Sequence, residues 1–130
     1  MSTRNMRLTS PLNPELLTAL RSAYGSVGII RAGQKRLPPR TRSDGSRTGW
    51  QWGEEYAIDC PFCGDTTRQM VLSYEYGVHT SNIQDGYNLH LVRCFADDCH
   101  ENKANLYSLW GNLQRHGYKR RMPRHLASMR

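Results

Sequence analysis

Two short segments, Cys60-Pro61-Phe62-Cys63-Gly64-Asp65 and Cys94-Phe95-Ala96-Asp97-Asp98-Cys99, decide the fold of this chain. They contain all four cysteines of the sequence, as one pair separated by two residues and a second pair separated by four. Pairs with this spacing are typical of structural zinc sites, in which four thiolates surround one ion. Gly64 directly follows the first pair and suits the tight turn that such a pair needs, because glycine tolerates positive φ.

The thirty residues between the cysteine pairs leave room for two antiparallel strands that bring the two turns together, as in a zinc ribbon. Strands are predicted at residues 55–60, 68–74 and 87–94, which gives a three-stranded antiparallel sheet. A helix is predicted at residues 102–116, where Leu106, Leu109, Trp110 and Leu113 form one apolar stripe that can lie on the sheet. The predicted fold class is therefore small α+β, with a zinc-ribbon domain at residues 51–117.

The four cysteines could instead form two disulfides or remain unligated thiols. Disulfides persist in oxidising compartments, but no apolar stretch of a signal peptide follows Arg4 and Arg7. No run approaches the length of a membrane-spanning helix. We therefore expect a cytoplasmic protein without a membrane partner, whose cysteines bind one structural zinc ion.

The predicted zinc ligands are Cys60, Cys63, Cys94 and Cys99, with the adjacent His100 as the alternative to Cys99. Catalytic zinc usually keeps an open position for water, whereas four thiolates close the site and make the ion a poor Lewis acid. The sequence thus predicts a non-catalytic protein and no catalytic residue. An enzyme with an unrecognised site is a minor alternative.

The flanks of the predicted ribbon are basic. Residues 1–50 contain nine basic and two acidic residues, and residues 101–130 contain seven basic residues and one acidic residue. The centre is acidic, because residues 51–100 contain two basic and eight acidic residues. We expect a basic N-terminal arm at 1–50, with a short helix at 14–24 and a flexible linker at 31–49, and a basic C-terminal tail at 118–130. This segregation of charge favours a polyanionic partner, nucleic acid first, over a surface that serves only solubility.

The cysteine segments resemble the zinc-binding domain of bacterial and phage DNA primases, in its four-cysteine variant. The resemblance rests on CPFCGDTTRQMVLS at 60–73, HLVRCFADDC at 90–99 and the helix that follows, and it covers residues 54–116. This chain departs from the commonest cellular pattern at two points. That pattern has histidine at the position of Cys63, and its second ligand pair is spaced by two residues, where this chain has four. The connection at 77–86 is also longer than in compact members.

The resemblance implies a module that grips single-stranded template DNA beside a primase catalytic core. No cluster of acidic residues suited to two-metal nucleotidyl transfer is evident in this chain. We therefore expect a stand-alone or split-off accessory piece, which a phage or mobile element would suit, with a replication or polymerase protein as a further partner.

Single strands are bound by cationic side chains that contact phosphates and by aromatic faces that stack on bases. The alternatives are solvation for the basic residues and packing for the aromatic ones, Trp50 and Trp52 included. The predicted contacts lie in the arms and beside the strands: Lys35, Arg36, Arg40, Arg42, Arg47, Arg68, Tyr74, Tyr76, Tyr87, Arg93, Lys119, Arg120, Arg121 and Arg124.

The sequence therefore predicts a zinc ribbon that binds nucleic acid in replication, with single-stranded DNA favoured and RNA as the other substrate. The alternative function is an adaptor whose basic arms dock on a protein or on a ribonucleoprotein such as the ribosome.

Overall fold

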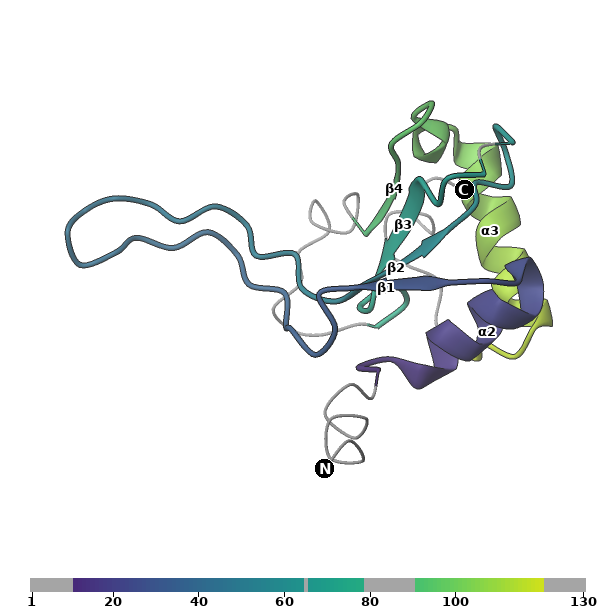
Figure 1. Ribbon diagram of the computed structural model, residues 1–130, viewed down its shortest axis with the longest axis horizontal. Coiled ribbons are helices and arrows are strands. Elements are labelled where there is room, and N and C mark those ends of the chain that lie inside the picture. The colour runs from purple at the N-terminus through teal and green to yellow at the C-terminus, as the bar shows by residue number, and fades with distance from the viewer. Residues whose placement is uncertain (1–10, 65, 79–90, 121–130) are drawn as a thin grey trace.

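The computed structural model describes residues 11–64, 66–78 and 91–120 of the chain (Figure 1). These residues form a four-stranded antiparallel sheet in the order β1-β2-β3-β4, together with two α-helices and a 3₁₀ turn. The elements in chain order are α2 (Pro14–Tyr24), β1 (Gly28–Ile30), β2 (Glu55–Ile58), β3 (Met70–Ser73), β4 (Val92–Cys94), η2 (Cys99–Glu101) and α3 (Lys103–Arg115). The small α+β class predicted from the sequence is confirmed.

The core lies between one face of the sheet and the two helices. Register pairs Tyr56 with Leu72 and Ile58 with Met70, so these four side chains share a face, and all four are fully buried. The leucines of both helices belong to the same buried cluster. The residues on the opposite face, among them Ala57, Val71 and Ser73, are buried as well, so side chains cover that face too.

Helix α2 begins and ends where the sequence predicts. Asn13 caps it by accepting a hydrogen bond from the Leu16 N–H at 3.1 Å, and Pro14 occupies its first turn. The helix is not part of a separate arm, however, because Leu16, Leu17 and Leu20 are buried in the common core. An apolar stripe of three leucines needs a partner, and the sheet with α3 supplies it.

The expected three-stranded sheet has a fourth strand, which the sequence prediction missed. Strand β1 pairs with β2, with Ile29 opposite Tyr56. Three residues are too few for an alternating pattern to be visible in the sequence. Strand β4 is the end of the strand predicted at 87–94, of which residues 87–90 lie outside the described ones.

The expected linker at 31–49 is instead part of an antiparallel hairpin that projects from the sheet (Figure 1). Leu37 and Gln51 exchange both backbone hydrogen bonds, and the same register continues to Arg42, whose N–H donates to the Ser46 carbonyl at 2.7 Å. An Asp-Gly step at the tip, Asp44-Gly45, is a strong hairpin signal that the arginine- and proline-rich composition masks. We call residues 37–51 the basic hairpin.

Helix α3 confirms the helix predicted at 102–116. Asn102 caps it by accepting from the Ala104 N–H at 2.9 Å, and its predicted apolar stripe is buried. Trp110 packs edge-to-face against Tyr76 and Tyr118. In the described part of the chain, neither helix combines the length and apolar character needed to cross a bilayer.

Candidate functional site

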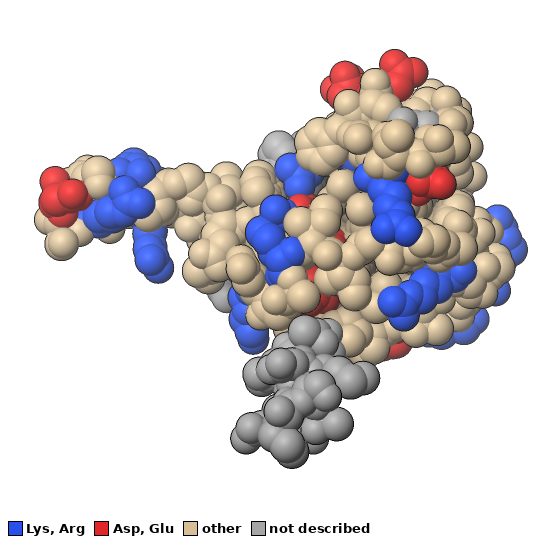
Figure 2. Space-filling model, in the orientation of Figure 1, with Lys and Arg blue, Asp and Glu red and all other residues tan. Residues whose placement is uncertain are grey.

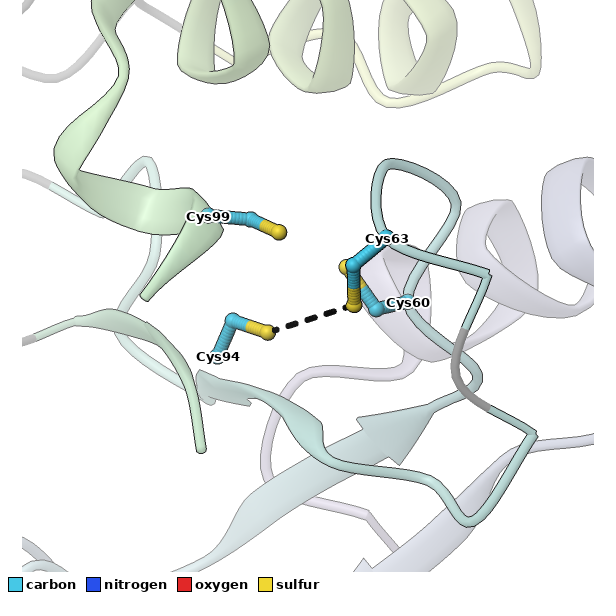
Figure 3. Close-up of side chains that lie close together, drawn as sticks. All are labelled: Cys60, Cys63, Cys94 and Cys99. Atoms are coloured by element: carbon cyan, nitrogen blue, oxygen red, sulfur yellow. Dashed lines mark hydrogen bonds between the residues drawn. The ribbon is translucent and has the colours of Figure 1, made fainter. Parts of the chain in front are cut away.

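The four cysteine sulfurs meet at one end of the sheet, where β2 and β4 end. Cys60 and Cys63 lie in the turn after β2, Cys94 ends β4, and Cys99 begins η2. All four sulfur atoms lie within 4.8 Å of one another, and Figure 3 shows them directed toward a common centre. Gly64 follows the first turn with φ of 75°, as the sequence suggested.

The distances within this cysteine cluster fit one tetrahedral metal ion. Four sulfurs at about 2.3 Å from an ion stand about 3.8 Å apart, and the Cys63 and Cys94 sulfurs are 3.9 Å apart. A disulfide requires about 2.05 Å, and all four cysteines are free. The cluster can therefore hold a metal ion such as zinc.

Backbone N–H groups stabilise the thiolate form at both turns. Burial disfavours the Cys94 thiolate, but the N–H groups of Cys99, Asp97 and Ala96 donate to its sulfur and lower the pKa of Cys94 to about 7. Burial raises the pKa of Cys60, and two N–H groups of its own turn oppose that effect. The donors therefore favour the charged sulfur at Cys94, whereas burial and the neighbouring thiols raise the pKa of Cys99.

The structure brings Cys99, not His100, into the cluster. The His100 Nδ1 accepts a hydrogen bond from the Cys94 N–H at 2.8 Å. His100 thereby holds the second cysteine turn in shape from outside the cluster.

The sheet face opposite the helices carries arginine side chains. The strand register places Arg93 opposite Val71. The Arg68 side chain lies across β1, so close to Gly28 that a Cβ on this glycine would be 3.1 Å from the Nη1 atom of Arg68. Arg31 reaches the same face through an ion pair with Glu55. We call this surface, defined by Arg31, Arg68 and Arg93, the arginine face.

Glu55 organises the arginine face from a buried position. It is 2% exposed and pairs with both Arg31 and Arg93. Arg68 is exposed and donates to the Ser26 hydroxyl. Two guanidinium groups are thus held by one carboxylate, and the third has no acidic partner among the described residues, so the face keeps a positive balance.

A column of stacked planar groups borders the arginine face. The rings of Trp50 and Trp52 stack with centroids 5.1 Å apart. The guanidinium of Arg93 lies 4.7 Å from the Trp52 centroid and 5.1 Å from that of Phe95, and that of Arg36 lies 5.0 Å from Trp50. We call these five residues the aromatic column.

Phe95 ends the aromatic column and directly follows the cysteine Cys94. Phe95 is 59% exposed, although its ring lies against the Arg93 guanidinium. The column therefore connects the cysteine cluster to the base of the basic hairpin through side-chain contacts.

Some predicted contacts have structural roles instead. Tyr76 is fully buried against Trp110, so the prediction that it stacks on bases is wrong. The Arg36 side chain is 4% exposed and paired with Glu75, so it is not available to a phosphate. The Tyr74 hydroxyl accepts a hydrogen bond from the Arg36 N–H at 2.9 Å, which fixes this ring at the hairpin base.

Other predicted contacts are exposed. Figure 2 shows Lys and Arg side chains on the hairpin and over the sheet. The exposed predicted residues are Lys35, Arg40, Arg42, Arg47, Arg68, Lys119 and Arg120, of which Arg120 pairs with Glu15 at 2.7 Å. Tyr87, Arg121 and Arg124 lie outside the described residues.

The sequence prediction missed Arg31 and Phe95. Phe95 could have been found, because it stands two residues from Arg93 at the end of a strand. No sequence signal marks Arg31, whose place depends on its pairing with Glu55 across the sheet.

Fold and site together define a small α+β protein with a four-cysteine cluster suited to a metal ion. Comparison of the chain with protein-family models, with curated proteins and with solved structures finds no match.

Proposed function

We propose that the four cysteines hold one structural zinc ion and that the protein binds single-stranded nucleic acid, with DNA favoured, across the arginine face. A donor set of four sulfurs suits zinc. Four protein ligands fill the tetrahedral positions, which leaves none for a catalytic water. The zinc would lock the ends of β2 and β4 together in a zinc-ribbon arrangement.

Protein purified without chelator is expected to contain one zinc ion per chain. Four thiolates in one tetrahedral cluster bind zinc strongly enough to retain it through purification. Elemental analysis by plasma mass spectrometry measures the stoichiometry. Native protein without a transition metal would contradict the zinc proposal, and iron in place of zinc would show in the same spectrum.

The observation that carries the nucleic-acid proposal is the exposed Phe95 ring beside Arg93 on the arginine face. A single strand offers phosphates to guanidinium groups and unpaired bases to an aromatic ring. The arginine face provides both within one surface, next to the rigid cysteine turn. Single exposed apolar side chains are common on protein surfaces, so it is the pairing of this ring with the Arg93 guanidinium, 5.1 Å from its centroid, that favours a binding role.

The role we propose is that of a non-catalytic replication accessory, in keeping with the resemblance of residues 54–116 to primase zinc-binding domains. In this role the protein holds single-stranded template, with a replication or polymerase protein as its partner. The sulfur cluster stabilises the surface and does not take part in a reaction.

Replacing Phe95 with alanine is expected to lower the affinity for a labelled single strand about tenfold. Stacking of one base on an aromatic side chain contributes about 1–3 kcal/mol, and the exposed ring contributes little to the core. Fluorescence anisotropy measures the affinity, and a thermal melt establishes that the variant remains folded. Ile29→Ala, which shortens another exposed apolar side chain of the sheet, is the matched control with unchanged affinity.

Salt dependence tests the same interface. For three phosphate contacts on a single strand, one for each arginine of the face, the slope of log K against log salt is about −2. A binding constant insensitive to salt, or a Phe95→Ala variant that binds as well as the parent, would refute the proposed interface. Equally weak binding to single strand and duplex, with co-purification of a protein, would favour the adaptor function.

A further inference from the structure

The basic hairpin carries positive charge beyond the arginine face. Arg40, Arg42 and Arg47 are exposed along it, and Asp44 at the tip is its one acidic residue. Between Leu37 and Gly49 the sequence contains no aromatic residue. The outer part of the hairpin can therefore contact phosphates but cannot stack on bases, in contrast to the arginine face.

The register of the hairpin distributes its arginines over both of its faces. Thr41 pairs with Arg47, so Arg47 lies on one face, and the neighbouring positions Arg40 and Arg42 lie on the other. The face with Arg40 and Arg42 is hollowed by a cavity of about 340 Å³, which Thr48 and Trp50 also line. A ribbon that is cationic on both faces suits a ligand with phosphates on both sides.

A groove of duplex DNA has this form. Two paired strands lie about 5 Å apart, and the major groove of B-form DNA is about 12 Å wide and admits a two-stranded ribbon. The phosphate rows border the groove on both sides, within reach of arginines on both faces. The major groove of A-form RNA is too narrow to admit side chains, so the fit is to DNA.

The base of the hairpin is fixed relative to the arginine face. Gly53 joins the hairpin to β2 with φ of 75°, and a Cβ there would lie 2.7 Å from the backbone of residues 34–36. Arg36 pairs with Glu75 and also contacts Trp50. The two cationic surfaces therefore keep a defined relation to each other.

We propose that the basic hairpin enters the major groove of duplex DNA next to the single strand on the arginine face, so that the preferred ligand is a junction of single-stranded and double-stranded DNA. This inference rests on the proposed single-strand function. The fixed hairpin base makes the two contacts act together, and linked contacts raise affinity through effective concentration.

The test compares the full chain on three labelled DNAs by fluorescence anisotropy: a single strand, a blunt duplex, and that duplex extended by a single-stranded tail. The tailed duplex is expected to bind about tenfold tighter than either other DNA. In the variant Arg40→Ala/Arg42→Ala/Arg47→Ala the ratio of junction affinity to single-strand affinity falls toward one. For this variant on the tailed duplex, the slope of log K against log salt becomes shallower by about 2.7, because three phosphate contacts to a duplex are lost.

A variant with the same change of charge on the helices, Arg21→Ala/Lys103→Ala/Arg115→Ala, is the matched control and should keep the junction preference. A tailed duplex bound no tighter than the single strand would overturn the inference and leave the single-strand function standing. If the protein did not bind the single strand, but its affinity for the duplex still fell when the hairpin arginines were replaced, the proposed function would be overturned instead. A tailed RNA duplex bound as tightly as the tailed DNA would refute the major-groove contact.

Discussion

Replacing Cys60 or Cys94 with serine is expected to abolish zinc binding and to unfold residues 54–116. Both sulfurs are buried, at 2% and 1% exposed, and they anchor the ends of two strands. A structural zinc ion in a small domain contributes about 10 kcal/mol or more of apparent binding free energy, while a whole domain is stable by only about 5–15 kcal/mol. Loss of the metal should therefore remove most of the stability.

Circular dichroism and elemental analysis of the purified variants measure fold and metal content together. Ala96→Ser is the matched control, because it introduces serine into the second cysteine turn at an exposed position without removing a sulfur. A Cys60→Ser protein that melts at the parent temperature and retains one zinc ion would refute the structural role of the cluster.

Replacing Asn13 with alanine is expected to lower the free energy of unfolding by about 3 kcal/mol. The Asn13 Nδ2 donates to the Tyr74 carbonyl at 2.8 Å and to the Tyr118 hydroxyl at 3.1 Å, while its Oδ1 caps α2 through Leu16. Loss of a cap costs about 1 kcal/mol, and buried groups left without partners cost about 1–3 kcal/mol. Urea unfolding of the zinc-loaded protein measures the change.

Two variants separate these contributions. Asn102→Ala removes the cap of α3, whose oxygen is exposed, and should cost only about 1 kcal/mol. Asn13→Ser keeps an oxygen for the cap but lacks the amide donors, so it should recover only the part due to capping. If Asn13→Ala cost no more than Asn102→Ala, α2 would not be an integral part of the core.

The sequence predicted those parts of the fold that depend on local pattern. Helices α2 and α3 carry leucines at helical spacing and have asparagine caps, and their positions match the predicted ranges. The cysteine spacing predicted the four-sulfur cluster, because two short turns at strand ends have few ways to approach each other. Each of these signals, a leucine stripe, a cap or a cysteine pair, spans only a few residues of the chain.

The parts that the sequence did not reveal depend on contacts between distant residues. Tyr76 is buried because its ring packs against Trp110 in α3. No local sequence pattern distinguishes a tyrosine that packs in the core from one that stacks on a base. Strand β1 is defined by its pairing with β2. Arg36 resembles a free phosphate contact in the sequence, but its side chain is buried and paired with Glu75.

The constant pairing register of the basic hairpin has a consequence for how its length can change. Side chains alternate between the two faces of a strand. Adding one residue to each strand of the hairpin, between its base and the arginines, would therefore move each outer arginine to the opposite face. Adding two residues to each arm would restore their sides and extend the reach by about 7 Å. Related chains should therefore tolerate insertions here in multiples of four residues, with the turn at the tip kept intact.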